Sequence, residues 1–392
     1  MDSFRRNVPL LAISQTLMMS TMSLIMATVA LVGSNLAVDK SYATLPLAIL
    51  FFAVMFTSIP AAMLMKRIGR KPAFMFACIF GVSAGLVATY AIVNNSFWLF
   101  SLSAALIGVF NGFGNYFRFV AADVVTEDKK SLAISYVLLG GVVAAIIGPN
   151  LAIYTYDVIE NANFAGSYAS IIALYLLILI TLSFLKLPNT KSDIDHESEY
   201  EVRDLFTIAR QPKFIVGIIC GMFGYGIMSF VMTATPLAMQ HHAHDFDDIS
   251  FVIQWHILAM YAPSFITGHL IRRFGIYNIL LVGALLIALC IAINLKGSSI
   301  THYWIALVLL GIGWNFLFIG ATTLITETYH AAERSKTQAL NDFVIFTTVA
   351  LSSLSAGALQ HQFGWKIVNL GVLPLLLIIL IGVIWGKLRY PQ

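Results

Sequence analysis

The composition of this chain excludes most classes of soluble protein. Of its 392 residues, 59% are hydrophobic and only 11% are charged, and its mean hydropathy is +0.85, whereas soluble domains carry about 25% charged residues. So few charged residues cannot cover the surface of a soluble enzyme or a nucleic-acid-binding protein. The net charge of +4 adds little to this conclusion. We therefore expect a membrane protein with the lipid bilayer, and no nucleic acid, as its partner.

Twelve apolar runs, each long enough to cross a bilayer, follow one another along the chain. A helix rises about 1.5 Å per residue, so a hydrocarbon core about 30 Å thick needs about 20 residues. The runs cover residues 8–33, 43–65, 73–92, 97–120, 132–154, 166–187, 213–239, 250–271, 276–295, 303–326, 337–359 and 365–386. The sequence thus predicts an all-α membrane protein with twelve transmembrane helices, and the first run is too long for a removed signal peptide.

Lysine and arginine residues on the short loops predict the orientation, because cytoplasmic loops carry an excess of them. Placing Arg5 and Arg6 in the cytoplasm also places there the basic residues at positions 66, 67, 129, 130, 272 and 273. Both termini are therefore predicted to be cytoplasmic, in a multi-pass protein of the bacterial inner membrane.

One long polar segment divides the spans into six plus six, and the two halves are related. This segment runs from Leu187 to Pro212 and carries six acidic residues. The predicted domains are an N-terminal six-helix bundle (1–187), a cytoplasmic linker (188–212) and a C-terminal six-helix bundle (213–392). An offset of 206 residues aligns Met22 and Met26 with Met228 and Met232 without a gap, which indicates an internal repeat.

The loop after the second run carries a motif that repeats after the eighth run. Residues 62–72 read Ala-Met-Leu-Met-Lys-Arg-Ile-Gly-Arg-Lys-Pro, and residues 268–275 read Gly-His-Leu-Ile-Arg-Arg-Phe-Gly. The first segment resembles the cytoplasmic loop signature of the major facilitator superfamily, with Ala62 in place of its first glycine and Lys66 in place of its acidic residue. The resemblance implies two pseudo-symmetric six-helix halves and secondary transport by alternating access, with the substrate bound near the bilayer midplane.

The fourteen methionines are distributed unevenly. Nine lie in residues 1–75 and the other five lie between residues 222 and 260, although methionine used as core filler would spread over all spans. Two rows recur at four-residue spacing, which places each row on one helix face; they are Met18, Met22 and Met26, and Met228 and Met232. We expect the first row to contribute symmetrically to a site formed by the second.

The next span adds His256 and Met260, one helical turn apart. An ionisable residue inside a membrane span is a functional candidate by default. Thioether and imidazole groups suit the soft ion Cu(I), and a thioether binds and releases a metal without a proton to lose. The residues themselves therefore favour a copper site formed by Met228, Met232, His256 and Met260.

This pattern, in which His256 follows 24 residues after Met232, is similar to that of the CcoA-like copper importers of the same superfamily. The resemblance implies import of copper into the bacterial cytoplasm for assembly of cytochrome oxidase, with Cys220 at an auxiliary position. Copper is then the transported substrate, a cytoplasmic copper chaperone is a candidate recipient, and we expect no permanently bound cofactor. The carrier is expected to be a monomer.

The loop after the seventh span is rich in metal ligands and is predicted to face outward. It contains His241, His242 and His244 together with three aspartates. Such a loop is either a metal-capture element or an ordinary solvated loop.

Several alternatives remain open. In one, methionines line an adaptable cavity and Trp255, Trp314, Tyr225 and Phe230 stack the isoalloxazine of riboflavin, because a near branch of the family has been linked to riboflavin. In another, the chain is a membrane metal receptor that does not transport, although it has no soluble output domain. Arg118, within the run 97–120, is either an auxiliary site residue or a packing group. The sequence contains no Walker A motif and no catalytic motif, so we expect a transporter and no enzyme.

Overall fold

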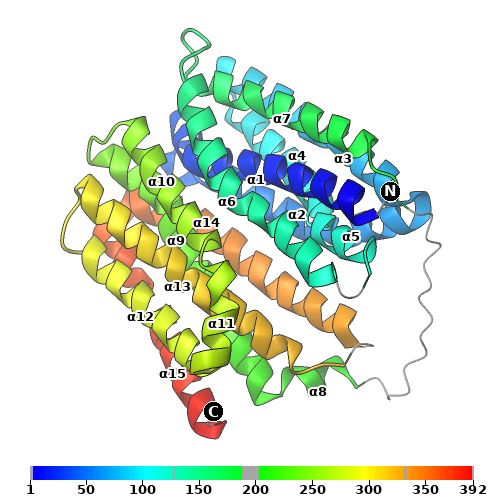
Figure 1. Ribbon diagram of the computed structural model, residues 1–392. Helices are drawn as coiled ribbons and strands as arrows, with labels where there is room; N and C mark the ends of the chain where they lie inside the picture. Colours follow the sequence, from blue (N-terminus) through cyan, green and yellow to red (C-terminus); the bar gives the residue numbers. More distant parts are fainter. Residues whose placement is uncertain (1–2, 127–128, 188–202, 331–332, 391–392) are drawn as a thin grey trace. The chain divides into compact units, whose positions relative to one another are not determined.

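The computed structural model describes residues 3–126, 129–187, 203–330 and 333–390, and within them it contains helices and no strand (Figure 1). The helices are α1 (Ser3–Leu36), the 3-10 helix η1 (Lys40–Tyr42), α2 (Leu45–Ile68), α3 (Arg70–Val93), α4 (Phe97–Gly114), α5 (Phe117–Asp123), α6 (Lys130–Thr155), α7 (Ala165–Ser183), α8 (Leu205–Ala209), α9 (Pro212–His241), α10 (Phe246–Tyr261), α11 (Ser264–Phe274), α12 (Ile276–Asn294), α13 (Ile300–Thr326), α14 (Arg334–Gly371) and α15 (Leu373–Arg389). The fold is that of an all-α membrane protein.

The helices account for the predicted membrane spans. Ten described helical stretches are long and apolar enough to cross a bilayer, and the bent pair α10 and α11 supplies an eleventh. The last stretch, Lys336–Arg389, is 54 residues long, which is enough for two crossings at about 1.5 Å per residue. It breaks at Gly364, whose backbone leaves the helical region with φ 75°, so the eleventh and twelfth predicted spans lie on either side of this residue.

Two predicted spans are interrupted where the sequence suggested continuous helices. The run 97–120 is divided between α4 and α5 by Asn115 and Tyr116, and the run 250–271 bends by 46° between α10 and α11. The second break contains Pro263, which has no backbone N–H to donate to the carbonyl four residues earlier. Apolar composition predicts that a segment crosses the membrane but does not predict breaks within its helix.

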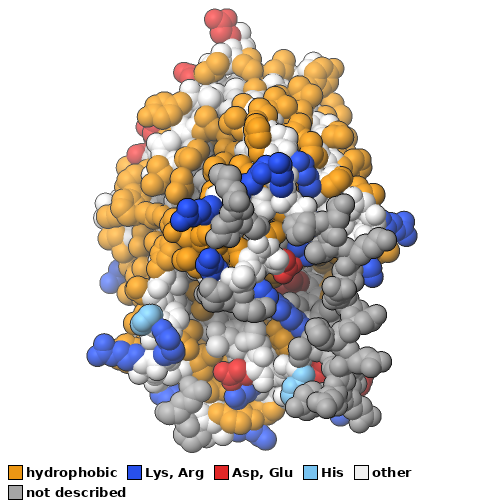
Figure 2. Space-filling model, turned by 45° about the vertical axis from the view of Figure 1, so that its right-hand side comes forward, with side chains coloured by type: hydrophobic (Ala, Val, Ile, Leu, Met, Phe, Trp, Pro, Cys, Tyr) orange, Lys and Arg blue, Asp and Glu red, His pale blue; other side chains and the backbone are white. Residues whose placement is uncertain are grey.

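The outer surface of the helices is strongly apolar. Large hydrophobic side chains such as Phe56, Trp98, Tyr154 and Leu388 are 69–78% exposed, and hydrophobic side chains cover much of the face shown in Figure 2. Water would not tolerate so much exposed apolar area, whereas lipid tails solvate it. The burial pattern therefore agrees with a multi-pass membrane protein.

The described chain falls into two compact units, which we treat separately. Unit 1 comprises Met1–Asp193 with Asp245–Gln254, and unit 2 comprises Ile194–His244 with Trp255–Gln392. Of the predicted linker 188–212, residues 188–202 lie outside the described residues, and the predicted domain boundaries stay a prediction.

Close helix packing in each unit depends on glycine. In unit 1, α1 packs on α6, where a Cβ atom at Gly148 would lie 2.5 Å from the carbonyl oxygen of Ser20. In unit 2, α12 packs on α13, and a Cβ atom at Gly283 would lie 2.9 Å from the carbonyl oxygen of Gly313. Small residues let helix backbones approach within the membrane, where dispersion contacts rather than the hydrophobic effect hold helices together.

Within unit 2, an ion pair joins the segment before α8 to the residue just before α14. Arg203 donates to both carboxylate oxygens of Glu333, at 2.8 Å from Nε and 2.6 Å from one terminal guanidinium nitrogen. The backbone N–H groups of Arg203 and His330 donate to the same carboxylate, whose side chain is only 1% exposed. These bonds hold the pKa of Glu333 well below its usual range, chiefly through the hydrogen bond from Arg203.

Candidate functional site

Four aromatic rings from three helices meet in unit 2, and we call Tyr225, Tyr261, Trp314 and Phe318 the aromatic cluster. The centroids of Trp314 and Phe318 lie 4.9 Å apart with nearly parallel planes. Tyr225 lies 5.2 Å from Trp314 and 5.8 Å from Phe318, and Tyr261 meets Trp314 edge-on at 6.3 Å. The cluster joins α9, the end of α10 and α13 through ring contacts of the kind that add stabilisation beyond buried area.

The spacing of the residues along each helix explains why they converge. Trp314 and Phe318 are four residues apart and therefore lie on one face of α13. On α9, Tyr225 is followed three and seven residues later by Met228 and Met232, so all three occupy one stripe of that helix. Because α9 packs on α13, Tyr225 reaches the α13 rings from the end of the methionine row.

The break between α10 and α11 lies beside the cluster and is held by a polar side chain of α13. The Asn315 amide nitrogen donates to the carbonyl of Met260 at 2.7 Å and contacts the Ser264 hydroxyl at 2.6 Å, while the Thr267 hydroxyl donates to the Asn315 amide oxygen at 2.7 Å. Asn315 thus satisfies backbone and hydroxyl groups at a helix break, which otherwise could not be tolerated in a membrane. Broken helices of this kind often form the substrate sites of transporters.

Several buried polar atoms of unit 2 have no hydrogen-bond partner among the described residues, and they include the imidazole Nε2 of His256, the indole N–H of Trp314 and the hydroxyl of Thr233. The His256 Nδ1 donates to the carbonyl of Leu307 at 2.8 Å, because a carbonyl only accepts. In a neutral imidazole the Nε2 atom is then an acceptor with a free lone pair. Buried atoms of this kind are costly unless a ligand or water pairs with them, so the imidazole of His256 and the indole of Trp314 are candidates to contact a substrate.

The four residues of the predicted copper site all lie in buried positions of unit 2. Met228, Met232 and Met260 are 3–6% exposed, and His256 is fully buried. The described residues hold no group of three or more His, Cys, Asp and Glu side chains placed to bind a metal ion, and three of the four predicted ligands are methionines. The copper site therefore stays a prediction.

The other predicted auxiliary residues have ordinary structural surroundings. Met18 is buried against α4, where a Cβ atom at Gly114 would lie 2.1 Å from its sulfur, whereas Met22 and Met26 are half-buried. Arg118 is exposed, with its guanidinium 4.8 Å from the ring centroid of Phe119. Cys220 is a buried free thiol, and the roles predicted for these residues stay predictions.

Two histidines of the predicted capture loop hold that loop to α13 and the turn before it. His242 Nδ1 lies 2.8 Å from the Tyr303 hydroxyl, and His244 Nε2 donates to the carbonyl of Ser298 at 2.7 Å. His241 contacts the His242 ring edge-on at 5.6 Å. Metal capture by this loop stays a prediction, and the contacts supply a structural use for two of its three histidines.

The aromatic residues proposed for a flavin separate into two groups. Tyr225 and Trp314 come together, as expected. Trp255 does not join them, because it is 39% exposed and its ring packs edge-on against Trp304 at 5.9 Å. Phe230 is buried without a ring contact among the described aromatic pairs. Sequence reasoning missed Phe318 and Asn315, although the four-residue spacing after Trp314 signalled the first.

Comparison with known proteins places this architecture in a family. The family model of the Major Facilitator Superfamily matches residues 11–290 and 217–392. The chain is 42% identical over 382 residues to the riboflavin transporter RfnT of Brucella anthropi, covering 97% of this chain and 95% of that protein. Two uncharacterized MFS-type transporters of Bacillus subtilis, YdeG and YddS, are 28% and 27% identical over 92% and 91% of this chain, and over 87% and 85% of their own lengths. With its broken apolar helices and its full-length relatives, this chain belongs to the Major Facilitator Superfamily and is a membrane transporter without enzymatic activity.

Proposed function

We propose that this protein transports riboflavin, moving it into the cytoplasm by alternating access across the inner membrane. The observation that carries the proposal is the 42% identity, over nearly the whole of both chains, to a protein named as a riboflavin transporter. This reading replaces copper as the main substrate, because the comparisons support the flavin alternative better than the metal.

The aromatic cluster supports the proposal, because its rings are of the type that stacks on a flavin. A flavin presents a flat, apolar, three-ring system, and aromatic side chains bind such systems by stacking, with about 1–3 kcal/mol for each stacked nucleic-acid base as a guide. Its pyrimidine edge alternates hydrogen-bond donors and acceptors. The free indole N–H of Trp314 and the free Nε2 of His256 are a donor and an acceptor of the type that such an edge requires.

Copper import remains a second candidate because of one observation at His256. Metal-binding histidines usually donate their second ring N–H to a carbonyl or carboxylate, which fixes the lone pair on the other nitrogen. His256 has this arrangement through Leu307, and Met260 follows one turn later. The two substrates make different demands on this residue, since copper needs the lone pair as a ligand and a flavin needs it only as one hydrogen-bond acceptor.

Uptake by whole cells tests the proposal. The chain is expressed in bacteria that cannot make riboflavin and lack their own carrier, and uptake of radiolabelled riboflavin and of copper is measured in parallel. We expect riboflavin accumulation and growth at low external riboflavin. Copper accumulation without riboflavin accumulation would overturn the proposal in favour of the metal.

The variant His256→Ala adds a second comparison in the same cells. We expect it to lower riboflavin uptake by about tenfold or less, the worth of one hydrogen bond, whereas loss of a metal ligand would abolish copper uptake. Trp255→Ala, outside the aromatic cluster, serves as the control for expression and membrane insertion.

A further inference from the structure

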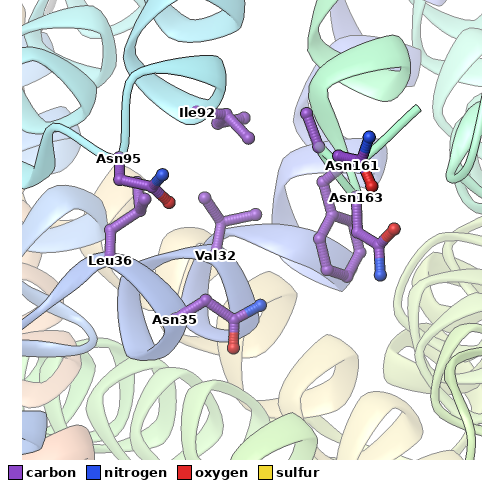
Figure 3. A pocket seen from close by; sticks show the side chains of 9 residues that line it. Val32, Asn35, Leu36, Ile92, Asn95, Asn161 and Asn163 are labelled. Atoms are coloured by element: carbon purple, nitrogen blue, oxygen red, sulfur yellow. The ribbon is translucent and has the colours of Figure 1, made fainter. Parts of the chain in front are cut away.

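A cavity of about 320 Å³ lies in unit 1, away from every residue discussed above as a candidate site. It is formed where α1 and α3 end and where the chain enters α7, and its nine lining residues are Val32, Asn35, Leu36, Ile92, Asn95, Asn161, Ala162, Asn163 and Phe164. In Figure 3, Asn95 and Ile92 lie on one side of the cavity and Asn161 and Asn163 on the opposite side. The charge pattern of the loops predicts that this end of the unit faces outward.

The lining is polar but uncharged, because four of the nine residues are asparagines and none is Asp, Glu, Lys or Arg. Asn163 donates to the Tyr156 hydroxyl at 2.8 Å, whereas the carboxamides of Asn35, Asn95 and Asn161 are exposed and bond to none of the described residues. Each free carboxamide offers two donors and one acceptor oxygen. Hydroxyl groups also donate and accept, so the lining matches a neutral ligand with several hydroxyls.

The backbone holds these groups in set positions. Asn95 and Asn161 have φ angles of 51° and 58°, and Phe164 has a φ of 71°. Asparagine tolerates this left-handed region, but for a bulky residue it is a genuine outlier. Phe164 is held there by its N–H, which donates to the Tyr156 carbonyl at 2.7 Å, and by its ring, whose centroid lies 4.7 Å from that of Tyr156. Such conformations cluster at ligand clamps.

We propose that this cavity recognises a neutral ligand group with several hydroxyls. Resting on the proposed function, this group is the ribityl side chain of riboflavin at its first contact with the carrier. The carboxamides bind the ribityl hydroxyls, and the side chains of Val32, Ile92 and Phe164 cover the carbon backbone. Flavin mononucleotide differs by a terminal phosphate, and no basic side chain lines the cavity to balance that charge. The site therefore selects the uncharged vitamin.

The test removes the three free carboxamides without straining the backbone. The variant combines Asn35→Ala, on a helix, with Asn95→Gly and Asn161→Gly, since glycine accepts a positive φ. The control is Asn94→Ala, which removes an exposed neighbouring carboxamide that does not line the cavity. Uptake is measured for riboflavin and for lumiflavin, which keeps the ring system and lacks the ribityl chain.

We expect the triple variant to raise the apparent KM for riboflavin by about tenfold through lost hydrogen bonds, with its rate at saturation and its lumiflavin uptake unchanged. An unchanged riboflavin KM would overturn the inference, as would an equal loss for both flavins, since the latter indicates a general structural defect. Quenching of riboflavin fluorescence by the purified carrier provides a separate readout that does not depend on transport. The two proposals can fail separately. If the parent protein does not transport riboflavin but binds it, and if this binding is weakened in the triple variant and not competed by flavin mononucleotide, the proposed function fails and the proposed site stands.

Discussion

The rings of Trp314 and Phe318 stack with centroids 4.9 Å apart and planes 12° apart, and the indole N–H of Trp314 has no partner among the described residues. In the proposed riboflavin site, this one residue would supply both an aromatic face and a hydrogen-bond donor. Neighbouring rings from α9 and α10 contact the indole of Trp314 and restrict its orientation.

Trp314 can be divided into these two contributions by substitution. We expect Trp314→Ala to raise the apparent KM for riboflavin about tenfold or more, because stacking on an aromatic ring is worth about 1–3 kcal/mol. Trp314→Phe keeps the ring and loses the donor, so a rise of about fivefold follows from one hydrogen bond. Uptake assays at matched expression measure both effects, and equal losses in the two variants would contradict a stacking role.

The histidine loop gives a prediction that depends on pH. Burial lowers the pKa of His242 below its ordinary value, so the unfolded chain binds a proton more readily than the folded protein does. The sign follows directly: stability is full above pH of about 6.5 and declines as the pH falls below that value. We expect the melting temperature of the purified protein to drop between pH 7 and pH 5, and His242→Gln to reduce this drop. If the melting temperature of the variant fell by the same amount, the pH dependence would come from groups other than His242.

A triple substitution of the same loop separates structure from metal capture. Replacing His241, His242 and His244 by Ala removes the bonds to Tyr303 and Ser298, so we expect a loss of about 1–2 kcal/mol in stability. Riboflavin uptake at saturation should change little. A selective loss of copper uptake at limiting copper, without a change in melting temperature, would instead support the capture hypothesis.

The ion pair of Arg203 and Glu333 should contribute a constant amount of stability across the neutral range. Because the pKa of Glu333 is lowered in the folded protein, the contribution is complete above the unfolded value of about 4.3 and is lost as the pH falls below it. We expect Arg203→Ala to cost about 1–3 kcal/mol, since it leaves a buried carboxylate without its cation while two backbone N–H donors remain. Thermal unfolding should show the same gap between variant and parent from pH 5.5 to pH 8, and a gap that varies within that range would be evidence against this assignment.

The turn after α9 offers a stabilising substitution. Ala243 has a φ of 61°, in the left-handed region where its Cβ atom is strained, and the N–H of His244 donates to the Met239 carbonyl in the usual pattern of a helix end. Ala243→Gly should therefore raise stability by about 0.5–1 kcal/mol. Ala238→Gly, inside the helix, is the matched control and should lower it. A lower melting temperature for Ala243→Gly than for the parent protein would contradict backbone strain at Ala243.

The sequence by itself determined the fold class, the spans and the superfamily. Whether a segment enters lipid depends on its own apolar length, and the motif at residues 62–72 is read without knowing the fold, so these features need no tertiary information. The sequence also named Tyr225 and Trp314 together as candidates to stack a flavin, and their rings are in contact. Its methionine rows, however, favoured copper as the main substrate, because residue types at helical spacing reveal which ligands are present and not whether they bind an ion or serve packing. Met18, for example, lies against Gly114.

Tertiary structure alone decided which side chains meet. Ring contacts such as those of Tyr225 with Trp314 and Phe318 join helices nearly ninety residues apart in the chain, and they depend on how α9 crosses α13. Packing likewise excluded Trp255 from the cluster and gathered asparagines from three distant segments around one cavity. Local composition determines whether a helix prefers lipid or water. Which side chains converge on a candidate site depends on the rotation of each helix about its axis and on its contacts with other helices, and these are determined only when the chain packs.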